Sequence, residues 1–376
     1  MKKINIDSLY ENPKAFIAFF IGIFVAIFLA TTIVLYATKK DELATEIAEE
    51  EPFIDTNHTP FPDSDSVYSV LLLGRGGEGH SGGTLTDTNI LIRVDIQSKK
   101  VALISIPRDL WVSIPTDFNN ETNHKFNEAY AVAVNNTIYA NKRPEFRGVK
   151  GAGELTKYAA EVVTGIKANY YIDIDFNAFQ NLIDDLGGVT IESKVAWDDY
   201  FYPVKGKENE TCGMSASEFA EVHEKYSGFQ LEKQFECRYE HIHFDQGKNN
   251  LDGDLALKYV RSRHSATYGG DFSRSEKQFA LLKGVVEKLI SKKVLTTGKR
   301  LIEGLFDLVS TDLTIKRAQE LATIFGSPGD YEVVEINLTE ENVLSASKSS
   351  AGAYILVPKE GKNIWADVQG FIVSKL

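Results

Sequence analysis

The sequence predicts an α/β layered domain, and two kinds of segment support this prediction. Residues 67–73 and 101–106 are short apolar runs rich in β-branched and aliphatic residues, as expected for strands. Residues 273–291 have apolar side chains on one stripe of a helix, the clearest amphipathic pattern in the chain. Strands that alternate with helices along a chain are typical of a sheet layered with helices.

The remaining elements follow from turn and capping signals. The four residues QSKK separate two strands and predict a hairpin turn, and Gly187 with Gly188 ends the helix before them. The tail after Gly326 holds a strand and a short helix, as an added edge of the sheet or a small subdomain. The sequence predicts strands at 67–73, 89–96, 101–106, 170–174, 189–193 and 331–337, and helices at 155–163, 176–186, 251–259 and 273–291.

The N-terminal region predicts a membrane anchor. Residues 15–37 carry no charge and are long enough to span a bilayer as a helix. The flanking lysines favour a cytoplasmic N-terminus at residues 1–14. Residues 38–66 are acidic, as in a solvated stalk. A cleaved signal peptide is the alternative, but the apolar run exceeds the usual length of that type of segment. We therefore expect a single-pass protein with its large domain outside the cytoplasm.

Composition excludes some partners. The chain has 376 residues, 43% of them hydrophobic, which is enough for a sizeable core. Its formal net charge of -12 argues against broad nucleic-acid binding, which needs a basic surface. Basic residues that cluster in such an acidic chain are therefore informative.

A glycine-rich loop follows the first predicted strand. Gly74, Gly76 and Gly79 have the spacing of a dinucleotide-binding motif, in which a helix follows the third glycine. Here residues 86–94, TDTNILIRV, predict a strand instead. We therefore expect a loop between two strands and no NAD site. Backbone N–H groups in such a loop can still face an anionic ligand.

The two cysteines lie in a segment without clear periodicity. Cys212 and Cys237 fall within residues 197–243, which we interpret as a surface insertion. In an exported domain they are expected to form a disulfide bond. Two unpaired thiols are the alternative, and the absence of CxxC or CxH pairs argues against zinc.

Arginines gather at the ends of the predicted elements. Arg108 directly follows a strand, and Arg261 and Arg263 are two residues apart, on one face if that segment is extended. Arg274 and Gln278 share one side of the strongest helix near its start. Guanidinium groups bind phosphate oxygens in a bidentate manner, so this pattern indicates a phosphate or pyrophosphate site.

Several stretches resemble the LytR-CpsA-Psr family in order, over about residues 67–325. They include TDTNILIRVDIQSKKVALISIPRD, HKFNEAYA, GIKANYYIDIDFNAFQNLIDDLGGV and the segment from GKNNLDGDLALKYVRSRHS to DFSRSEKQFALLKGVV. The resemblance implies a three-layer α/β/α fold, a central mixed sheet flanked by helices that enclose a tunnel for a lipid chain, after one transmembrane helix. The family domain is then expected at residues 67–326, with a C-terminal extension at 327–376.

The resemblance also implies site residues. Asp87 matches the acid of the Ser/Thr-Asp-Thr step, which helps to hold Mg²⁺, and Arg108 matches the arginine of Pro-Arg-Asp. Lys125 matches the lysine of a Lys-Ile/Phe-Asn segment. The paired phosphate-binding arginines and the Arg-x-x-x-Gln helix start are matched by Arg261, Arg263, Arg274 and Gln278.

Two positions depart from the family pattern. Gly76 stands where the family usually has an acid, and Leu85 stands where it often has an arginine. Glu78 and His80 are candidate replacements, and we expect Glu78 to assist Asp87 as a metal ligand. We also expect the glycine-rich loop to be a mobile rim of the diphosphate site.

The resemblance implies a membrane-bound phosphotransferase. Its donor is a glycopolymer on a polyprenyl-pyrophosphate carrier, its acceptor is peptidoglycan, and its cofactor is Mg²⁺. Two alternatives stay open at this point. A non-catalytic lipid-carrier binder or envelope sensor would bind the carrier without releasing a product, and a pyrophosphatase would use water as the acceptor.

Overall fold

The computed structural model describes residues 66–80, 82–291, 304, 306–325 and 331–376. The chain divides into two compact units: Met1–Leu182 together with Val286–Leu376, and Ile183–Val285. The predicted membrane span at residues 15–37 lies outside the described residues. Within the described ranges, no helix has both the length and the apolar character needed to cross a bilayer.

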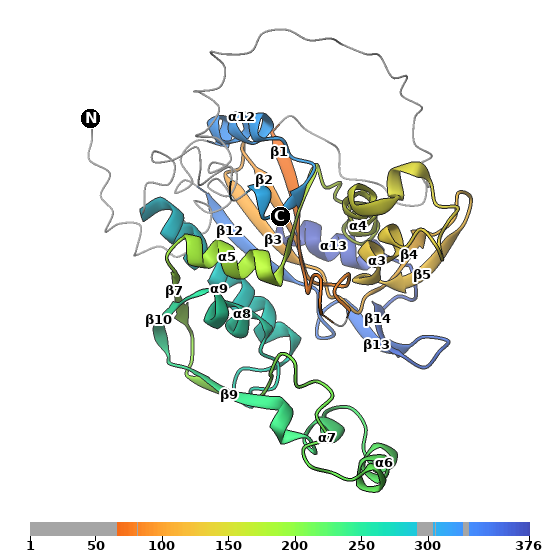
Figure 1. Ribbon diagram of the computed structural model, residues 1–376. Helices are drawn as coiled ribbons and strands as arrows, with labels where there is room; N and C mark the ends of the chain where they lie inside the picture. Colours follow the sequence, from red (N-terminus) through yellow and green to blue (C-terminus); the bar gives the residue numbers. More distant parts are fainter. Residues whose placement is uncertain (1–65, 81, 292–303, 305, 326–330) are drawn as a thin grey trace. The chain divides into compact units, whose positions relative to one another are not determined.

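A six-stranded mixed sheet forms the centre of the first unit, as predicted. Its strand order is β11-β6-β1-β2-β3-β12 (Figure 1). β2 is antiparallel to both β1 and β3, whereas β6 runs parallel to β1 and β12 parallel to β3. The C-terminal segment therefore supplies an edge strand of the main sheet. The strands are β1 (Val67–Arg75), β2 (Thr86–Asp95), β3 (Lys100–Ser105), β6 (Tyr170–Asp175), β11 (Ser310–Thr311) and β12 (Glu332–Asn337).

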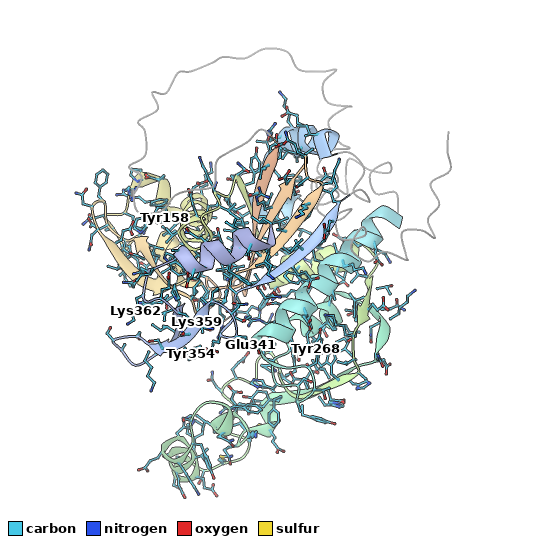
Figure 2. All side chains as sticks on the ribbon, turned by 180° about the vertical axis from the view of Figure 1, so that it is seen from behind. Tyr158, Tyr268, Glu341, Tyr354, Lys359 and Lys362 are labelled. Atoms are coloured by element: carbon cyan, nitrogen blue, oxygen red, sulfur yellow. A yellow bond between two sulfur atoms is a disulfide. The ribbon has the colours of Figure 1, made fainter. Side chains whose placement is uncertain are left out.

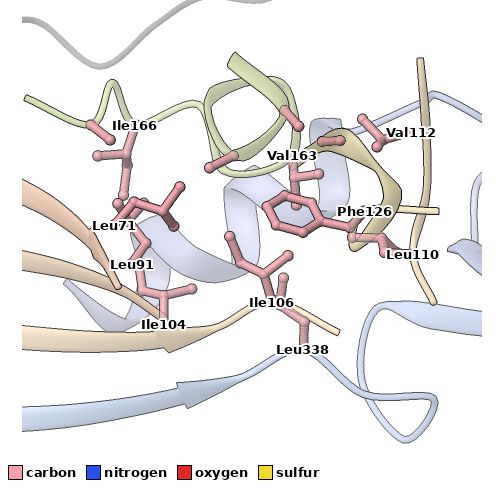
Figure 3. Packing of buried hydrophobic residues seen from close by; sticks show 14 of the residues in the cluster. Leu71, Leu91, Ile104, Ile106, Leu110, Val112, Phe126, Val163, Ile166 and Leu338 are labelled. Carbon is pink, nitrogen blue, oxygen red and sulfur yellow. The ribbon is translucent and has the colours of Figure 1, made fainter. Parts of the chain in front are cut away.

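One face of this sheet carries the main hydrophobic core. Leu71 pairs with Leu91, which pairs with Ile104, and all three side chains are fully buried (Figure 3). They pack in one cluster with residues of α3, α4 and α13. Apolar residues at a helical spacing give α4 its buried face, and Gly165, with a φ of 71°, ends that helix. The helices are α3 (Glu128–Val134), α4 (Gly148–Thr164) and α13 (Ala366–Lys375).

A helix also contacts the opposite face of the sheet. Arg317 of α12 (Ile315–Phe325) donates a hydrogen bond to the Tyr170 hydroxyl at 2.9 Å and lies 5.8 Å from the centre of the Tyr68 ring. Successive side chains of a strand point to opposite faces, so these tyrosines lie on the face away from Leu71. The central sheet is thus flanked by helices on both faces.

Two hairpins complete the first unit. β4 (Trp111–Pro115) pairs with β5 (Glu121–Lys125), and β13 (Leu344–Lys348) pairs with β14 (Tyr354–Pro358). Lys359, which directly follows β14, donates a hydrogen bond to the Asn342 carbonyl at 2.6 Å (Figure 2). A short 3-10 turn, η1 (Pro144–Phe146), precedes α4.

The second unit contains two strand pairs and several helices. β7 (Val189–Ser193) pairs with β10 (Gly247–Leu251), and β8 (Trp197–Pro203) pairs with β9 (Tyr239–Phe244). The unit also contains α8 (Gly253–Arg261) and α9 (Gly270–Ser291), and the last six residues of α9 belong to the first unit. The helix α5 (Phe176–Asp185) begins in the first unit and ends in the second.

The predicted insertion, residues 197–243, takes in β8, nearly all of β9 and the segment between these two strands. It contains α6 (Ala216–Lys225), α7 (Phe229–Glu232) and η2 (Glu236–Arg238). Cys212 and Cys237 form a disulfide bond with a Cα–Cα distance of 5.6 Å, so the expected pairing is confirmed. No residue of α6 is buried, so packing holds this helix only weakly.

Candidate functional site

The glycine-rich loop is a closed turn between two strands. Gly77 N–H donates to the Gly83 carbonyl at 2.9 Å, and Gly83 N–H donates to the His80 carbonyl at 3.0 Å. β2 begins at Thr86, three residues after Gly83, and no helix follows Gly79. The geometry of a dinucleotide-binding turn is therefore absent from this loop, as predicted.

Gly77 is the glycine on which this loop depends. Its φ of 80° is a conformation that other residues rarely adopt, and an added Cβ would lie 2.7 Å from the Cβ of Asp175. The loop is thereby held against the end of β6. Its glycines serve close backbone packing, and Glu78 is exposed at the tip of the turn.

Asp87, Arg108 and Lys125 come together in the first unit as one chain of charges. Arg108 Nη1 lies 2.7 Å from Asp87 Oδ1, and Arg108 Nε lies 3.2 Å from Asp109 Oδ2. Lys125 Nζ contacts the other oxygen of Asp109 at 2.5 Å. Two carboxylates thus alternate with two cations. The structure brings together three of the four residues predicted in this unit, and the fourth is Glu78 of the glycine-rich loop.

Backbone hydrogen bonds explain why these three side chains meet. Thr86 N–H, beside Asp87, donates to the Asn127 carbonyl at 3.2 Å, and Asn127 N–H donates to the Arg108 carbonyl at 3.1 Å. Lys125 ends β5, two residues before Asn127. The start of β2, the turn after β3 and the end of β5 are therefore fixed to one another before any side chain is considered.

The side chains of Asp87, Arg108, Asp109 and Lys125 are partly buried. Burial disfavours the charged guanidinium of Arg108, but Asp87 and Asp109 outweigh that effect and raise its pKa above the ordinary value. The Asp87 side chain remains 42% exposed. A bound diphosphate could therefore reach these cations from solvent, in competition with the two carboxylates.

Sequence reasoning missed a second ion pair beside this chain. Arg75 Nε lies 2.9 Å and 3.1 Å from the two carboxylate oxygens of Asp173, and its guanidinium carbon lies 5.1 Å from the centre of the Tyr130 ring. Arg75 is the register partner of Thr86, next to Asp87. An arginine of β1 is therefore paired with the residue that follows Leu85, which stands where the family pattern often has an arginine.

The environment of Asp173 is unusual for a carboxylate. Its side chain is fully buried, and burial raises its pKa although Arg75 opposes that shift. Burial also raises the pKa of Tyr130 to about 12. Asp173 occupies a strand position that pairs with the core residue Leu73. A charged residue at a core position of a strand requires a partner of opposite charge. Asp173 within the apolar strand pattern was therefore the sequence feature that could have revealed this ion pair.

The described part of the first unit offers little for a metal ion. In the described ranges, no group of three or more His, Cys, Asp or Glu side chains has a metal-binding arrangement. Asp87 uses one carboxylate oxygen for Arg108 but stays partly exposed. These residues fit a magnesium ion only as one carboxylate that shares the ion with substrate oxygens. The metal role of Asp87 and Glu78 stays a prediction.

Arg261 and Arg263 flank the end of α8 in the second unit. Arg261 is the last residue of the helix, and its Nη1 donates to the Tyr202 hydroxyl at 3.1 Å. Burial raises the pKa of Tyr202, and the charge of Arg261 opposes this effect. Ser262 leaves the helix with an extended ψ of 132°, which carries the chain to Arg263.

Arg274 and Gln278 lie one turn apart on α9, as the i, i+4 spacing predicts. The helix begins at Gly270, three residues earlier than predicted, so Arg274 belongs to its second turn. Arg274 is only 9% exposed. The four predicted residues of this unit thus lie between the end of α8 and the second and third turns of α9.

His264 supports the arginine segment. Its ring stacks on Phe229 of α7, with ring centres 4.3 Å apart and planes within 5°. Its Nε2 lies 3.4 Å from Glu232, also on α7. The disulfide-bonded insertion therefore contacts the residue that directly follows Arg263.

The chain is similar to known proteins in sequence and in fold. The polyisoprenyl-teichoic acid–peptidoglycan teichoic acid transferase TagU of Enterococcus faecalis is 24% identical over 262 residues, which cover 69% of this chain and 66% of that protein. The protein of the same name from Oceanobacillus iheyensis is 23% identical, covering 84% of each chain. The crystal structure of Bacillus subtilis TagV shares the fold, with a TM-score of 0.52 and 20% identity, covering 84% of this chain and 98% of that one.

A family model matches most of the chain. The model of the LytR_cpsA_psr family covers residues 30–367, which include every predicted site residue, the whole second unit and most of the first. This protein therefore belongs to the LytR-CpsA-Psr family.

Proposed function

We propose that this protein is a membrane-anchored phosphotransferase outside the cytoplasm. It moves a glycopolymer with its phosphate from a polyprenyl-pyrophosphate carrier to a hydroxyl of peptidoglycan. The observation that carries the proposal is the charge chain of Asp87, Arg108, Asp109 and Lys125, with its two cations held beside an exposed carboxylate. The names of the relatives, which are teichoic acid transferases to peptidoglycan, support the same reaction class.

In the proposed reaction, the acceptor oxygen bonds to the phosphorus that carries the glycan. The bond from that phosphorus to the bridging oxygen breaks, polyprenyl phosphate leaves, and the hydroxyl proton is released. Transfer of this type depends mainly on positioning and on neutralising phosphate oxygens. Arg108, Lys125, Arg261, Arg263 and Arg274 are the residues that we assign as donors to these phosphate oxygens. Gln278 adds a neutral donor beside Arg274.

A magnesium ion would be held by Asp87, with Glu78 as a second candidate ligand, and would add positive charge at the diphosphate. The remaining contacts to the phosphate oxygens come from side chains of the protein. Arg108 lies between Asp87 and Asp109, so a phosphate oxygen would compete with these two carboxylates for its guanidinium group. A phosphate oxygen would compete with Asp109 for Lys125 in the same way.

The central experiment measures transfer with the full-length protein in detergent or vesicles. The donor is a polyprenyl-diphosphate-linked saccharide and the acceptor is a soluble peptidoglycan fragment. Arg261→Ala and Arg263→Ala should each slow transfer by about ten-fold or more, because each lost fork removes charge-assisted bonds worth roughly 1.5–3 kcal/mol. Arg93→Ala is the matched control, because Arg93 lies six residues along β2 from Asp87 and contacts Asp95.

The outcomes separate the candidate functions. Full transfer by both arginine variants, with normal melting, would remove these residues from the site. Binding of the donor without release of polyprenyl phosphate would indicate a carrier-binding or sensing protein. Release of polyprenyl phosphate at the same rate without acceptor would indicate a pyrophosphatase.

Localisation needs its own test. The uncharged segment at residues 15–37 and the acidic stretch after it support a domain outside the cytoplasm. A reporter fused after Leu376 that works only outside the cytoplasm should be active, and a matched reporter that works only in the cytoplasm should be silent. The reverse result would contradict the proposed topology.

A further inference from the structure

Lys277 is a buried cation that the proposed reaction does not use. It lies on α9 between Arg274 and Gln278, and its side chain is 0% exposed. Its ammonium nitrogen lies 3.8 Å from the centre of the Trp197 ring and 5.1 Å from that of Tyr268. An ammonium group in such a site is costly unless it makes specific contacts.

The contacts of Lys277 are with Ser262, the residue between the two arginines. Lys277 Nζ lies 3.3 Å from the Ser262 carbonyl oxygen and 3.4 Å from its hydroxyl oxygen. The Ser262 carbonyl belongs to the peptide group whose nitrogen is that of Arg263. Because a peptide group is planar, holding this oxygen also fixes the direction in which Arg263 begins.

A buried carboxylate holds the other side of Arg263. Asp199, on β8, is 1% exposed and accepts hydrogen bonds from the Ser262 hydroxyl at 2.7 Å and from the His264 N–H at 3.1 Å. The His264 N–H belongs to the peptide group that follows Arg263. Both peptide groups that flank Arg263 are therefore held by buried charged side chains, one from α9 and one from β8.

Lys277 and Asp199 belong to one network of charged and polar side chains. Asp199 is the carboxylate whose charge favours the ammonium form of Lys277. Tyr268, over whose ring Lys277 lies, donates its hydroxyl to Glu276 at 2.8 Å, and Glu276 pairs with Lys194. Arg261 is held differently, by the end of α8 and by Tyr202.

We propose that Lys277 and Asp199 are positioning residues that orient Arg263 toward the diphosphate through the backbone of Ser262 and His264. This inference rests on the proposed function and assigns a role to two residues that do not touch the substrate. It predicts that replacing Lys277 with an apolar side chain of similar length weakens diphosphate binding without lowering the stability of the protein.

The test uses Lys277→Met in the full-length protein, with farnesyl diphosphate as the probe. Methionine keeps the unbranched stem, and Asp199 keeps three donors, the third being Phe201 N–H at 2.8 Å. Burial disfavours the ammonium form of Lys277, and methionine removes this cost while Asp199 keeps its donors, so the melting temperature should be unchanged or higher. Probe binding, measured by calorimetry, should weaken roughly five- to ten-fold, because the Arg263 fork loses its alignment.

A double variant distinguishes positioning from general damage. Lys277→Met added to Arg263→Ala should weaken binding no further than Arg263→Ala alone, because Lys277 acts through that arginine. Additive losses would contradict the inference. Lys283→Met, on the same helix, is the matched control and should bind the probe like the wild type.

A milder variant covers the case in which Lys277→Met does not fold. Ser262→Ala removes the hydroxyl that Lys277 and Asp199 share and should weaken probe binding about two- to five-fold, again only when Arg263 is present. Normal binding by Ser262→Ala and by folded Lys277→Met would overturn the inference while leaving the proposed function intact. Normal binding by Arg263→Ala would instead remove Arg263 from the diphosphate site, and failure of the wild type to release polyprenyl phosphate would overturn the proposed function.

Discussion

Asp87 Oδ1 accepts a hydrogen bond from Arg108 Nη1 at 2.7 Å. Any metal ion at Asp87 would therefore compete with this guanidinium group. The family position that usually supplies a second acid is Gly76 in this chain, and Glu78 is the nearest acid in the turn. The exposed position of Glu78 leaves it able to approach a metal ion held by Asp87 and the substrate.

We predict a graded response to magnesium. Removal of Mg²⁺ by a chelator should abolish transfer, and Asp87→Asn should do the same at any magnesium concentration. Glu78→Ala should raise the magnesium needed for the half-maximal rate by a few-fold, because one ligand is lost from a site with few protein ligands. An unchanged titration curve for Glu78→Ala would leave Asp87 as the sole assigned carboxylate, and an active Asp87→Asn would refute the metal assignment.

Lys277 predicts a pH dependence of stability. Burial lowers the pKa of its ammonium group from 10.5 to about 8, and the charge of Asp199 only partly opposes that shift. Between about pH 8 and 10.5 the unfolded chain therefore binds more protons than the folded protein, so stability rises with pH in this window. The shift corresponds to roughly 3 kcal/mol of unfolding free energy.

Urea unfolding of the wild type and Lys277→Met at both ends of this window measures the effect. The unfolding free energy of the wild type should rise relative to that of Lys277→Met by on the order of 2–3 kcal/mol as the pH increases. Comparison of the two proteins cancels the titration of tyrosines and other lysines. Parallel pH profiles of the two proteins would show that folding does not lower the pKa of Lys277.

At the scale of elements, the insertion depends on its disulfide bond. The α6 helix buries no residue, and its start is fixed by a capping box between Ser215 and Glu218. The bond between Cys212 and Cys237 closes a loop with a sequence separation of 25. Closure of a loop of this size stabilises by about 3 kcal/mol in the chain-entropy estimate.

We predict that Cys212→Ser with Cys237→Ser loosens the insertion while sparing the sheet of the first unit. Hydrogen exchange should increase in α6 and α7 but not in β1, β2 or β3, because only the insertion loses a constraint. Thiol labelling of unfolded, unreduced wild-type protein should find no free thiol. Two labelled thiols would refute the bond, and equal exchange in both proteins would refute its role.

Elements with regular apolar patterns were predictable, and those with inward polar residues were not. The hairpin of β2 and β3 followed from apolar runs around a four-residue turn. The second half of α4 was predicted at residues 155–163, whereas its glycine-containing first half was not. The strand β8 was missed because Asp199 occupies an inward position beside Trp197. Its partner Ser262 lies on another element, so the local pattern carried no sign of it.

The candidate site shows the same limit. Asp87, Arg108 and Lys125 were named from a family resemblance, and their contact through Asp109 depends on hydrogen bonds between three distant segments. The pair of Arg75 and Asp173 was not predicted. The two residues are separated by 98 positions, and only the parallel pairing of β1 with β6 brings them together.

At the scale of the whole molecule, the C-terminal segment completes the first unit. β12 pairs with β3, and buried residues of the tail join the main core, including Ile336, Leu344, Val368 and Ile372. Each such side chain contributes about 1.5–3 kcal/mol by burial, whereas a whole domain is stable by only about 5–15 kcal/mol.

Deletion of residues 331–376 should therefore prevent cooperative folding. We expect the truncated protein to lose its thermal transition and its near-ultraviolet circular dichroism. Replacement of residues 205–236 by a short linker, with Cys237→Ser, is the contrasting control and should keep the transition, because that insertion buries little. A truncated protein that melts like the full chain would show that the tail is an independent subdomain.

The pairing of β12 with β3 also determines when the protein can fold. A parallel pair between strands at opposite ends of a domain closes a very long loop, and topologies of this kind fold slowly. Until β12 emerges, the edge of β3 presents unpaired backbone groups and the apolar run from Val101 to Ile104. If the chain crosses a membrane from its N-terminus, the edge of β3 remains unpaired during nearly the whole of export. Such a nascent chain would benefit from a helper outside the membrane that shields an open strand edge until the last segment arrives.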